Sequence, residues 1–413
     1  MRKERLIVPV VVAVAVAWAV AQTIASLMFE RELARAIQDL QARGELSIWR
    51  SETDQGWLTS TGVIHLAPLF GDGWHLDISY RARHGLLSTR MDGYLQQHRE
   101  RTGQARVEIA RKPPAWEARY HPLSGTFDGT LKLSPLVLRQ EERTLALHGA
   151  RLALQGKFGD WKLHARLESA RLDDGDTTLE AGPVTLESRY TYIDGAYHFT
   201  QRDLLKVNGV HWRSPSLELD ADELVLHSKT DLDEQELRIR SELSLGKVMS
   251  ADQVLMTGKV VGELSRINAD ALRSLLNHLK VEAARGGTGV TRRDLLSLLT
   301  PQIRALMGDS PRLDLLEVDL DSPMLGLSLE GEGALIFDAR DLEGLEPEAL
   351  ETSEGRSAWR ERLDGDFLWR DLPAVVALWL GLPLDTEDMQ IDVVRGKVRI
   401  NGRPLPSLSQ RLP

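Results

Sequence analysis

A serine in the stretch QGWLTSTG is the first residue whose surroundings could support chemistry. A serine on a tight turn between glycines is typical of the nucleophile of a hydrolase. Such a turn needs glycine at both positions two residues from the serine, but Leu58 stands two residues before Ser60. The order of the chain also assigns no His or Asp partner to this hydroxyl. We therefore predict a turn at Gly56 and then a strand, with Trp57 and Leu58 in a core, and no catalytic residue.

Other polar clusters give no stronger candidate for a site. Four carboxylates in LDDGDTTLE have the composition of a calcium loop without its ligand spacing, and the alternation around them favours a hairpin turn. The 11 histidines include no His-x-His or His-x-x-x-His pair, so a zinc site is not predicted. We therefore expect no metal and no cofactor. The four carboxylates are those of Asp173, Asp174, Asp176 and Glu180.

The composition is that of a globular protein, with 413 residues of which 42% are hydrophobic and 27% charged. This length is enough for more than one ordinary domain. The net charge is -10 at pH 7 and no block of Lys and Arg follows Arg5, which disfavours a nucleic acid as a partner. The chain has no cysteine, which excludes disulfides and thiolate metal sites and fits an extracytoplasmic compartment.

The N-terminus has the pattern of a membrane anchor. A basic tail, residues 1–5, precedes the uncharged stretch Leu6–Met28, which as a helix would be about 34 Å long and could cross a hydrocarbon core of about 30 Å. The basic tail should stay in the cytoplasm, so the rest of the chain would be exported. A cleavable signal peptide ending near Ala19-Val20-Ala21 is the alternative, and cleavage stays open. Residues 29–44 are predicted to be a helical stalk or an ordinary surface helix.

Strands dominate the remainder of the chain. Apolar and polar residues alternate in runs such as Leu237–Leu245, which is typical of strands with one apolar face. We predict a mainly β fold in which regions 45–265 and 310–413 pack together as an antiparallel meander, either an extended curved sheet or a two-layer sandwich. Eight dipeptides are expected to form the hairpin turns. They are Asp72-Gly73, Asp92-Gly93, Asp128-Gly129, Asp174-Gly175, Asp194-Gly195, Asn208-Gly209, Asp364-Gly365 and Asn401-Gly402.

Helical spacing interrupts the strands over residues 266–309. Asn268–Lys280 has an Asn at the N-cap position and leucines on one helix face. Thr291–Asp309 should form the second helix of this pair, broken or kinked at Pro301. A third short helix is predicted over Leu372–Leu380.

Four stretches follow one another along the chain, namely QGWLTSTGVIHL, ARHGLLS, Leu306–Phe337 and the closing RGKVRINGRPLP. In these stretches and their order, the chain resembles the YdgA-like family of bacterial inner-membrane-anchored envelope proteins, a domain family of unknown function, although Leu86 stands where the family commonly has proline. The resemblance implies a single-pass protein with a cytoplasmic N-terminus and a periplasmic body, and it carries over no catalytic residue. Its signature positions here are Gly56, Trp57, Thr59, Ser60, His84, Gly85, Pro311, Asn401 and Gly402.

Two functions fit these observations. The first is a non-enzymatic, membrane-anchored envelope protein whose apolar sheet face forms a groove for lipid or another hydrophobic ligand, because an antiparallel sheet must bury its apolar face against something. The second is a scaffolding protein that binds another envelope protein by strand addition or through the helical pair.

Overall fold

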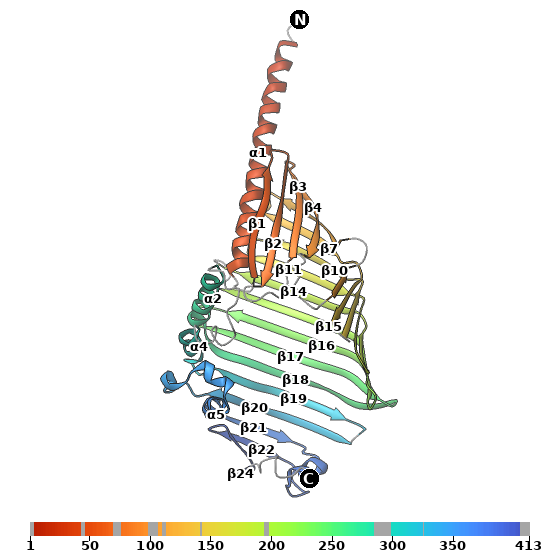
Figure 1. Cartoon of the computed structure of the whole chain (residues 1–413), viewed down its shortest axis with the longest axis vertical. Coiled ribbons are helices and arrows are strands. Elements are labelled where there is room, and N and C mark those ends of the chain that lie inside the picture. The colour runs from red at the N-terminus through yellow and green to blue at the C-terminus, as the bar shows by residue number, and fades with distance from the viewer. Residues whose placement is uncertain are drawn as a thin grey trace. The chain divides into compact units, whose positions relative to one another are not determined.

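The computed structural model describes residues 4–42, 46–68, 76–97, 106–109, 113–140, 143–193, 198–284, 299–324 and 326–404 (Figure 1). The chain divides into two compact units. Unit 1 consists of Met1–Glu168, Arg189–Ala196 and Leu279–Thr288, and unit 2 of Ser169–Ser188, Tyr197–His278 and Gly289–Pro413. The boundary after Glu168 falls inside the region 45–265. Both units are mainly β with antiparallel pairing, which confirms the predicted fold class at that level.

Unit 1 contains two antiparallel ladders. The longer ladder has the order β1(Leu46–Gln55), β2(Thr59–Pro68), β3(Leu76–Arg83), β4(Thr89–Gln97), β6(Ala115–His121), β7(Thr126–Lys132), β10(Arg151–Lys157) and β11(Asp160–Leu167). The shorter ladder has the order β5(Arg106–Ile109), β8(Leu136–Gln140) and β9(Arg143–His148). Many neighbouring strands are consecutive in the sequence, as the alternating pattern predicts, but β4 pairs with β6, β7 with β10 and β5 with β8.

A long helix, α1(Glu4–Ala42), packs against β1 and β4 of unit 1. Phe29 of α1 is 3% exposed and lies in a core with Tyr80, Ala82, Met91, Ala118 and Tyr120. Leu33, one helical turn further on, packs against the same core. Glu30 adds an ion pair of 3.0 Å with Arg50 of β1. The C-terminal part of α1 is therefore fastened to the sheet by apolar and polar contacts together.

No helix in the described part of the chain is both long and apolar enough to cross a membrane. The side chains of residues 1–17 lie outside that part. The anchor over Leu6–Met28 stays a prediction.

Unit 2 is built on one antiparallel ladder with short helices at its sides (Figure 1). Its strands, in ladder order, are β12(Ser169–Asp174), β13(Thr177–Ala181), β15(Phe199–Arg213), β16(Glu218–Leu232), β17(Glu236–Ser250), β18(Gln253–Asn268), β19(Arg312–Ser322), β20(Leu327–Phe337), β21(Leu363–Arg370), β22(Met389–Val394), β23(Lys397–Ile400) and β24(Arg403–Pro404). β14(Val184–Tyr192) crosses the boundary between the units.

Three helices after β18 lie at predicted helical positions, namely α2(Ala269–Ala284), α4(Thr300–Met307) and α6(Ala374–Leu380). The 3-10 helices η1(Leu342–Gly344) and η2(Pro347–Glu351) and the helix α5(Ser353–Arg360) were not predicted. The side-chain oxygen of Asn268 caps α2 by accepting a hydrogen bond of 2.8 Å from the backbone N–H of Ala271. The part of the predicted second helix before residue 299 lies outside the described residues. Pro301 stands in the first turn of α4, where a missing N–H is tolerated, and the predicted break at this residue stays a prediction because residues 285–298 lie outside the described part of the chain.

Several Asp-Gly and Asn-Gly dipeptides do not form the turns that the sequence suggested. Asn401-Gly402 is a turn, and Gly175 begins the turn after Asp174, the last residue of β12. Gly93, Gly129, Gly209 and Gly365 lie inside strands, and Asp72-Gly73 and Asp194-Gly195 are outside the described residues. A Cβ on Gly93 would stand 1.8 Å from the carbonyl oxygen of Ser79 and 2.7 Å from Trp116 Nε1. Glycine is needed there for the close approach of neighbouring strands.

Candidate functional site

One face of the unit 2 sheet carries an unbroken apolar row across eight neighbouring strands. Residues directly opposite each other in an antiparallel pair share a face, so the row can be followed from β15 to β22. Val318 and Met389 in this row are buried, whereas Leu243 is 38% exposed. The sheet face is therefore apolar along its width and only partly covered. The row consists of Leu205, Leu226, Leu243, Val260, Val318, Gly331, Trp369 and Met389.

This row ends in a cavity of about 600 Å³ between the sheet and α6. The volume lies within the range of about 300–1,000 Å³ that is usual for small-molecule pockets. Its walls are almost entirely apolar. They are formed by Leu255, Met256, Leu320, Asp321, Ser322, Leu327, Leu329, Trp369, Leu372, Pro373, Val376, Leu380, Met389, Ile391 and Ile400.

The two polar residues of the wall do not make the interior polar. Ser322 donates its hydroxyl hydrogen bond to the backbone carbonyl of Leu255, so the hydroxyl is already satisfied. Asp321 is exposed to solvent. Nε1 of Trp369, another residue of the wall, is buried without a hydrogen-bond partner. A bound water needs two to four polar partners, so a cavity with one such free donor holds water poorly and favours an apolar occupant.

α6 forms the cover of the cavity. Ala377 is completely buried and lets the helix approach a core that includes Leu372, Met389 and Ile400. Gly381 ends the helix in the left-handed conformation at φ 72°, which glycine adopts without strain. With the small Ala377 at the contact, the larger Val376 and Leu380 line the cavity beside it.

A glycine on β20 shapes the opposite wall. A Cβ added to Gly331 would lie 2.5 Å from Cε3 and 2.7 Å from Cζ3 of Trp369. The indole of Trp369 therefore lies against the bare backbone of β20, and a larger residue at Gly331 would push it away from the strand. Glycine at an inward position makes room for the indole in the wall and helps to set the shape of the cavity.

A second, polar cluster lies in unit 1, where α1 crosses the β1–β2 and β3–β4 loops. Ser60 Oγ lies 2.8 Å from His84 Nε2, and Thr89 Oγ1 lies 3.3 Å from His84 Nδ1. The side-chain amide of Gln22 donates a hydrogen bond of 2.6 Å to the His84 carbonyl. The ring of Phe29 is 5.2 Å from the imidazole, measured between centroids. The cluster thus joins the helix to both loops.

Burial lowers the pKa of His84, while the nearby Glu30 carboxylate acts to raise it. The net shift is downward, so the imidazole is neutral near pH 7, with one ring nitrogen as donor and the other as acceptor. That state matches two hydroxyl partners, each of which can donate or accept.

The Ser60–His84 pair has a nucleophile-and-base distance but lacks the rest of a hydrolytic site. Ser60 is 0% exposed and His84 is 7% exposed, so a substrate cannot reach the hydroxyl. The second ring nitrogen of His84 faces the hydroxyl of Thr89, where a triad would place a carboxylate. The geometry supports a structural role in holding α1 and the two loops together.

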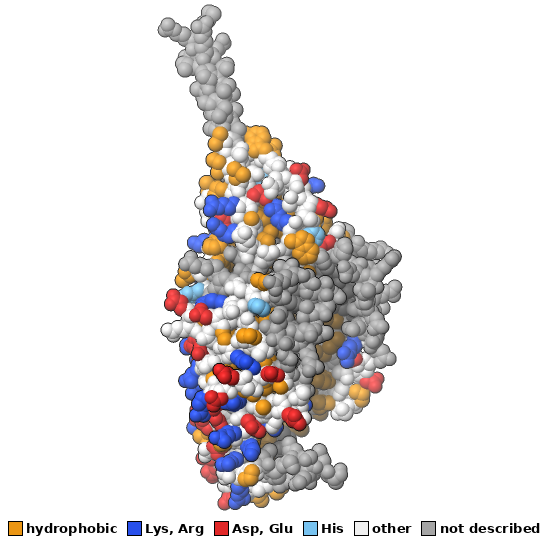
Figure 2. All heavy atoms as spheres, turned by 60° about the vertical axis from the view of Figure 1, so that its left-hand side comes forward, with side chains coloured by type: hydrophobic (Ala, Val, Ile, Leu, Met, Phe, Trp, Pro, Cys, Tyr) orange, Lys and Arg blue, Asp and Glu red, His pale blue; other side chains and the backbone are white. Residues whose placement is uncertain are grey.

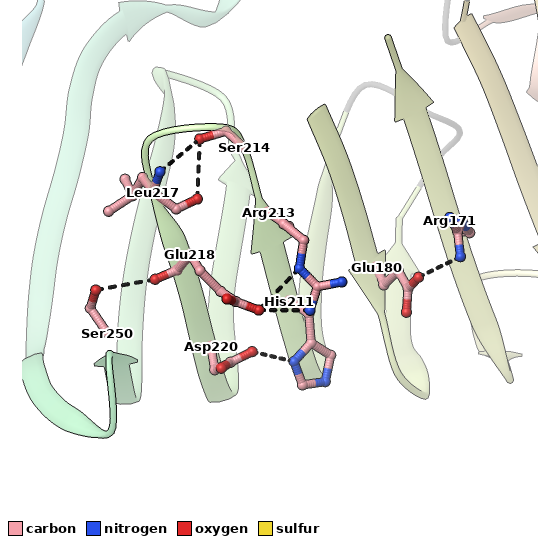
Figure 3. Close-up of polar contacts among 9 residues, drawn as sticks. All are labelled: Arg171, Glu180, His211, Arg213, Ser214, Leu217, Glu218, Asp220 and Ser250. Atoms are coloured by element: carbon pink, nitrogen blue, oxygen red, sulfur yellow. Dashed lines mark hydrogen bonds and ion pairs between the residues drawn. The ribbon is translucent and has the colours of Figure 1, made fainter. Parts of the chain in front are cut away.

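Two of the four carboxylates considered as a calcium loop, Asp173 and Glu180, form ion pairs on the surface of unit 2, and Figure 3 shows the pair of Glu180 with Arg171. Arg171 pairs with Glu180 at 2.7 Å and with Asp173 at 3.1 Å. Exposed cross-strand pairs continue along the neighbouring strands, with Arg213 and Glu218 2.6 Å apart. Within the described ranges, no group of three or more acidic or histidine side chains could hold a metal ion.

The predicted signature positions fall into three places. Gly56, Trp57, Thr59, Ser60, His84 and Gly85 gather at one edge of the unit 1 sheet. Trp57 and Leu58 are 46% and 48% exposed, so their predicted place in a core is wrong. They stand at the tip of a hairpin, beyond the last residue pair of its strands.

The other signature positions belong to unit 2. The Pro311 carbonyl accepts a hydrogen bond of 3.0 Å from the N–H of Phe337, at the start of β19. Asn401 and Gly402 form the β23–β24 turn, where Asn401 Oδ1 accepts a hydrogen bond of 2.8 Å from the N–H of Gln390. None of these three residues lines the cavity.

The cavity residues were not identified from the sequence as a site. The sequence did contain one signal in β20, where every second residue faces inward and the series is Leu327, Leu329, Gly331 and Gly333. Two inward glycines are unusual, because a filled core would need larger residues there. The sequence predicted the helix that covers the cavity, at Leu372–Leu380, but it did not indicate where this helix lies on the sheet.

Comparison with known proteins places the chain in a family without assigning it an activity. Neither the curated proteins nor the solved structures yield a match. The sequence model of a family of bacterial proteins of unknown function matches residues 1–345, which include Ser60, His84 and Pro311 but not Asn401 and Gly402. Because the match covers most of the chain, the protein belongs to this bacterial family, DUF945.

Proposed function

We propose that this protein is a membrane-anchored envelope protein that binds an acyl chain of a lipid in the cavity of unit 2, and that it is not an enzyme. The cavity of about 600 Å³ under α6 is the observation that carries the proposal. Its apolar walls gain dispersion contacts and lose water when an apolar chain enters.

An acyl chain fits the site better than a compact apolar molecule does because the apolar surface is long. The row from Leu205 to Met389 crosses eight strands. Seven strand spacings of about 4.8 Å give a length of about 34 Å along the sheet. This exceeds the length of one leaflet, about half of a 30 Å hydrocarbon core. The polar head group would stay outside the cavity because the walls are almost entirely apolar and could not replace the hydrogen bonds that it makes with water.

The anchor and the location belong to the same proposal. Residues 6–28 contain no charged residue and follow a basic tail, which supports a single span with the N-terminus in the cytoplasm and both units in the periplasm. The resemblance to the YdgA-like envelope proteins points the same way. In this location the protein would have membrane lipids within reach.

Scaffolding by strand addition has less support. At the C-terminal end of the unit 2 ladder, the strand β24 has two residues, Arg403 and Pro404, and proline offers no N–H to an added strand. A protein partner at α2 or α4 stays a prediction.

Site-specific photocrosslinking in living bacteria tests lipid binding on the full chain. The photoreactive residue p-benzoyl-phenylalanine replaces Leu329, which lines the cavity, in cells fed an alkyne-tagged fatty acid. The matched control carries it at Ser328, the preceding residue, which is exposed. Because successive residues of a strand point to opposite faces, the control samples the same region without facing the cavity.

We expect irradiation to attach the tagged acyl chain to the chain substituted at Leu329 and not to the chain substituted at Ser328. No tag at Leu329, or equal tagging at both positions, would overturn lipid binding in the cavity. A protein crosslink at Leu329 in place of the tag would favour the scaffolding function.

A further inference from the structure

Two loops at one edge of unit 1 expose large apolar side chains. The β1–β2 loop carries Trp57 and Leu58, which are 46% and 48% exposed. The β3–β4 loop carries Leu86 and Leu87, which are 36% and 71% exposed. The loops are neighbours, because Thr59 at the start of β2 is paired with Arg83 at the end of β3. Four apolar side chains therefore project from the same edge.

The exposed face of α1 continues this apolar surface. Trp18 of α1 packs edge-to-face on Trp57 with 5.5 Å between ring centroids, and the Gln22 hydrogen bond to His84 fixes the helix at the level of the loops. Three more residues of this part of α1 are strongly exposed. They are Val20 at 53%, Ile24 at 50% and Leu27 at 64%. Figure 2 shows hydrophobic side chains gathered where the described side chains of α1 begin.

A row of arginines lies directly behind the loops. Arg83 of β3, Arg90 of β4 and Arg119 of β6 are consecutive partners across three strands, and all three are exposed. Arg83 forms an ion pair of 3.2 Å with Asp92. Like charges directly opposite each other are unfavourable unless counter-charges are near. The row therefore suits an anionic surface that faces the loop edge.

We propose that this edge of unit 1, defined as the docking edge by Trp57, Leu58, Leu86, Leu87 and the three arginines, inserts into the outer leaflet of an anionic phospholipid bilayer. α1 measures about 18 Å from Leu6 to Trp18, less than a hydrocarbon core of about 30 Å, so the loops beside Trp18 reach past the head groups into the acyl region of the outer leaflet. The arginines lie further from the centre of the bilayer than the loops do, and they bind lipid phosphates. This inference rests on the proposed anchor, which brings α1 to the membrane.

The buried cluster behind the loops prepares the edge for docking. His84 at the base of the β3–β4 loop is held by Ser60 and Thr89, and its backbone N–H donates a hydrogen bond of 2.8 Å to the Leu58 carbonyl. The two loops are thus tied to each other and to α1. A preformed apolar edge loses little conformational entropy when it enters the membrane.

The absence of cysteine makes single-site labelling a direct test. The full chain is reconstituted into vesicles of phosphatidylethanolamine and phosphatidylglycerol after Leu87→Cys and attachment of an environment-sensitive nitrobenzoxadiazole dye. Ala13→Cys reports the anchor, and Tyr94→Cys is the control. Tyr94 is 53% exposed and lies five residues along β4 from Thr89, which is about 17 Å. Quenching by lipids brominated on the acyl chain measures the contact of each dye with the bilayer.

We expect the dyes at Leu87 and Ala13 to be quenched and the dye at Tyr94 to stay in water. Quenching at Ala13 without quenching at Leu87 would overturn the docking edge and leave the anchor standing. Quenching at neither position would overturn both. Equal quenching at Leu87 and Tyr94 would also overturn the docking edge, since unit 1 would then lie flat on the bilayer.

A charge variant tests the arginines separately. Arg90→Gln with Arg119→Gln should weaken docking in phosphatidylglycerol vesicles about fivefold for each arginine, and the loss should vanish in vesicles without anionic lipid. The matched control is Arg151→Gln with Arg166→Gln, an exposed and directly paired arginine pair near the other end of the strands. Equal loss in both double variants would show a nonspecific charge effect and overturn the role of the arginine row.

Discussion

Each unit places a helix on an antiparallel sheet, yet the two contacts differ in what lies between helix and sheet. Under α1, the ring of Phe29 fills the space next to His84 and Tyr120, at centroid distances of 5.2 and 6.3 Å. Under α6, about 600 Å³ stays open. Aromatic rings fill the space under α1, whereas Gly331 and Ala377 beside the cavity are too small to fill the space under α6. The residues beneath the helix decide whether the contact is a closed core or a pocket.

Substitutions in the two units should therefore have different effects. Truncation in unit 1 should cost stability, because it removes packed atoms or hydrogen-bond partners. Changes in the cavity wall of unit 2 should alter ligand binding more than stability.

The largest stability effect is expected from Phe29→Ala. Removing this ring leaves a void between α1 and the sheet and should lower the local free energy of unfolding of unit 1 by about 3–5 kcal/mol. Hydrogen exchange of β3 and β4 in the full chain measures the loss. Phe158→Ala is the control, because Phe158 is 45% exposed and its loss should cost at most about 1.5 kcal/mol. Equal losses would mean that α1 is not packed as described.

Gly331→Ala should disturb the cavity wall. The added methyl group must displace the indole of Trp369, which lies 2.5 Å from the ideal Cβ position, at a cost of about 1–3 kcal/mol. Acyl crosslinking at Leu329 should fall at the same time. Gly344→Ala is the matched control, since no atom lies within 4 Å of its Cβ position. Unchanged crosslinking in the Gly331 variant would argue against this account of the wall.

A smaller loss of stability is expected from Ser60→Ala. The substitution leaves one nitrogen of buried His84 without its partner and should cost about 1–2 kcal/mol in unit 1. Acyl crosslinking in unit 2 should not change. Ser124→Ala, which removes an exposed hydroxyl, should cost under about 0.5 kcal/mol. Loss of an enzymatic activity from the Ser60 variant, with unit 1 still stable, would contradict the structural role.

The pH dependence of unit 1 should follow His84. Its pKa in the folded chain lies below the value of about 6.5 expected when unfolded, so the unfolded state binds the proton more readily. The stabilising contribution of the neutral ring is present above that unfolded value and is lost as the pH falls through it towards the folded pKa. Hydrogen exchange of β3 and β4, corrected for the intrinsic rate, should show weaker protection at acidic pH. His84→Gln should reduce this dependence, and an unchanged dependence would assign it to another group.

Local sequence patterns were sufficient to predict the strands and helices that depend on neighbouring residues alone. Alternation predicts antiparallel strands such as β17, the Asn268 cap marks the start of α2, and the apolar run at Leu372–Leu380 predicts α6. Asn-Gly and Asp-Gly dipeptides were less informative, because a glycine required by a neighbouring strand, such as Gly93, looks the same as a glycine in a turn.

The contacts between distant segments could not be read from the sequence. Ser60 and His84 are 24 residues apart and meet only through the register of β2 with β3. The cavity depends on where α6 docks and on the indole of Trp369 crossing Gly331, neither of which has a local signature. The exposure of Trp57 likewise depends on the hairpin tip that carries it, which the sequence pattern did not indicate.

Native mass spectrometry of the full chain, released from detergent, tests the central claim about the cavity most directly. The wild type should carry one lipid mass, and Val376→Trp should lose it, because the larger ring fills the space under α6. Val394→Trp, at a 43% exposed position outside the cavity wall, should keep the lipid. Absence of lipid from the wild type, or its retention in the Val376 variant, would contradict acyl-chain binding in unit 2.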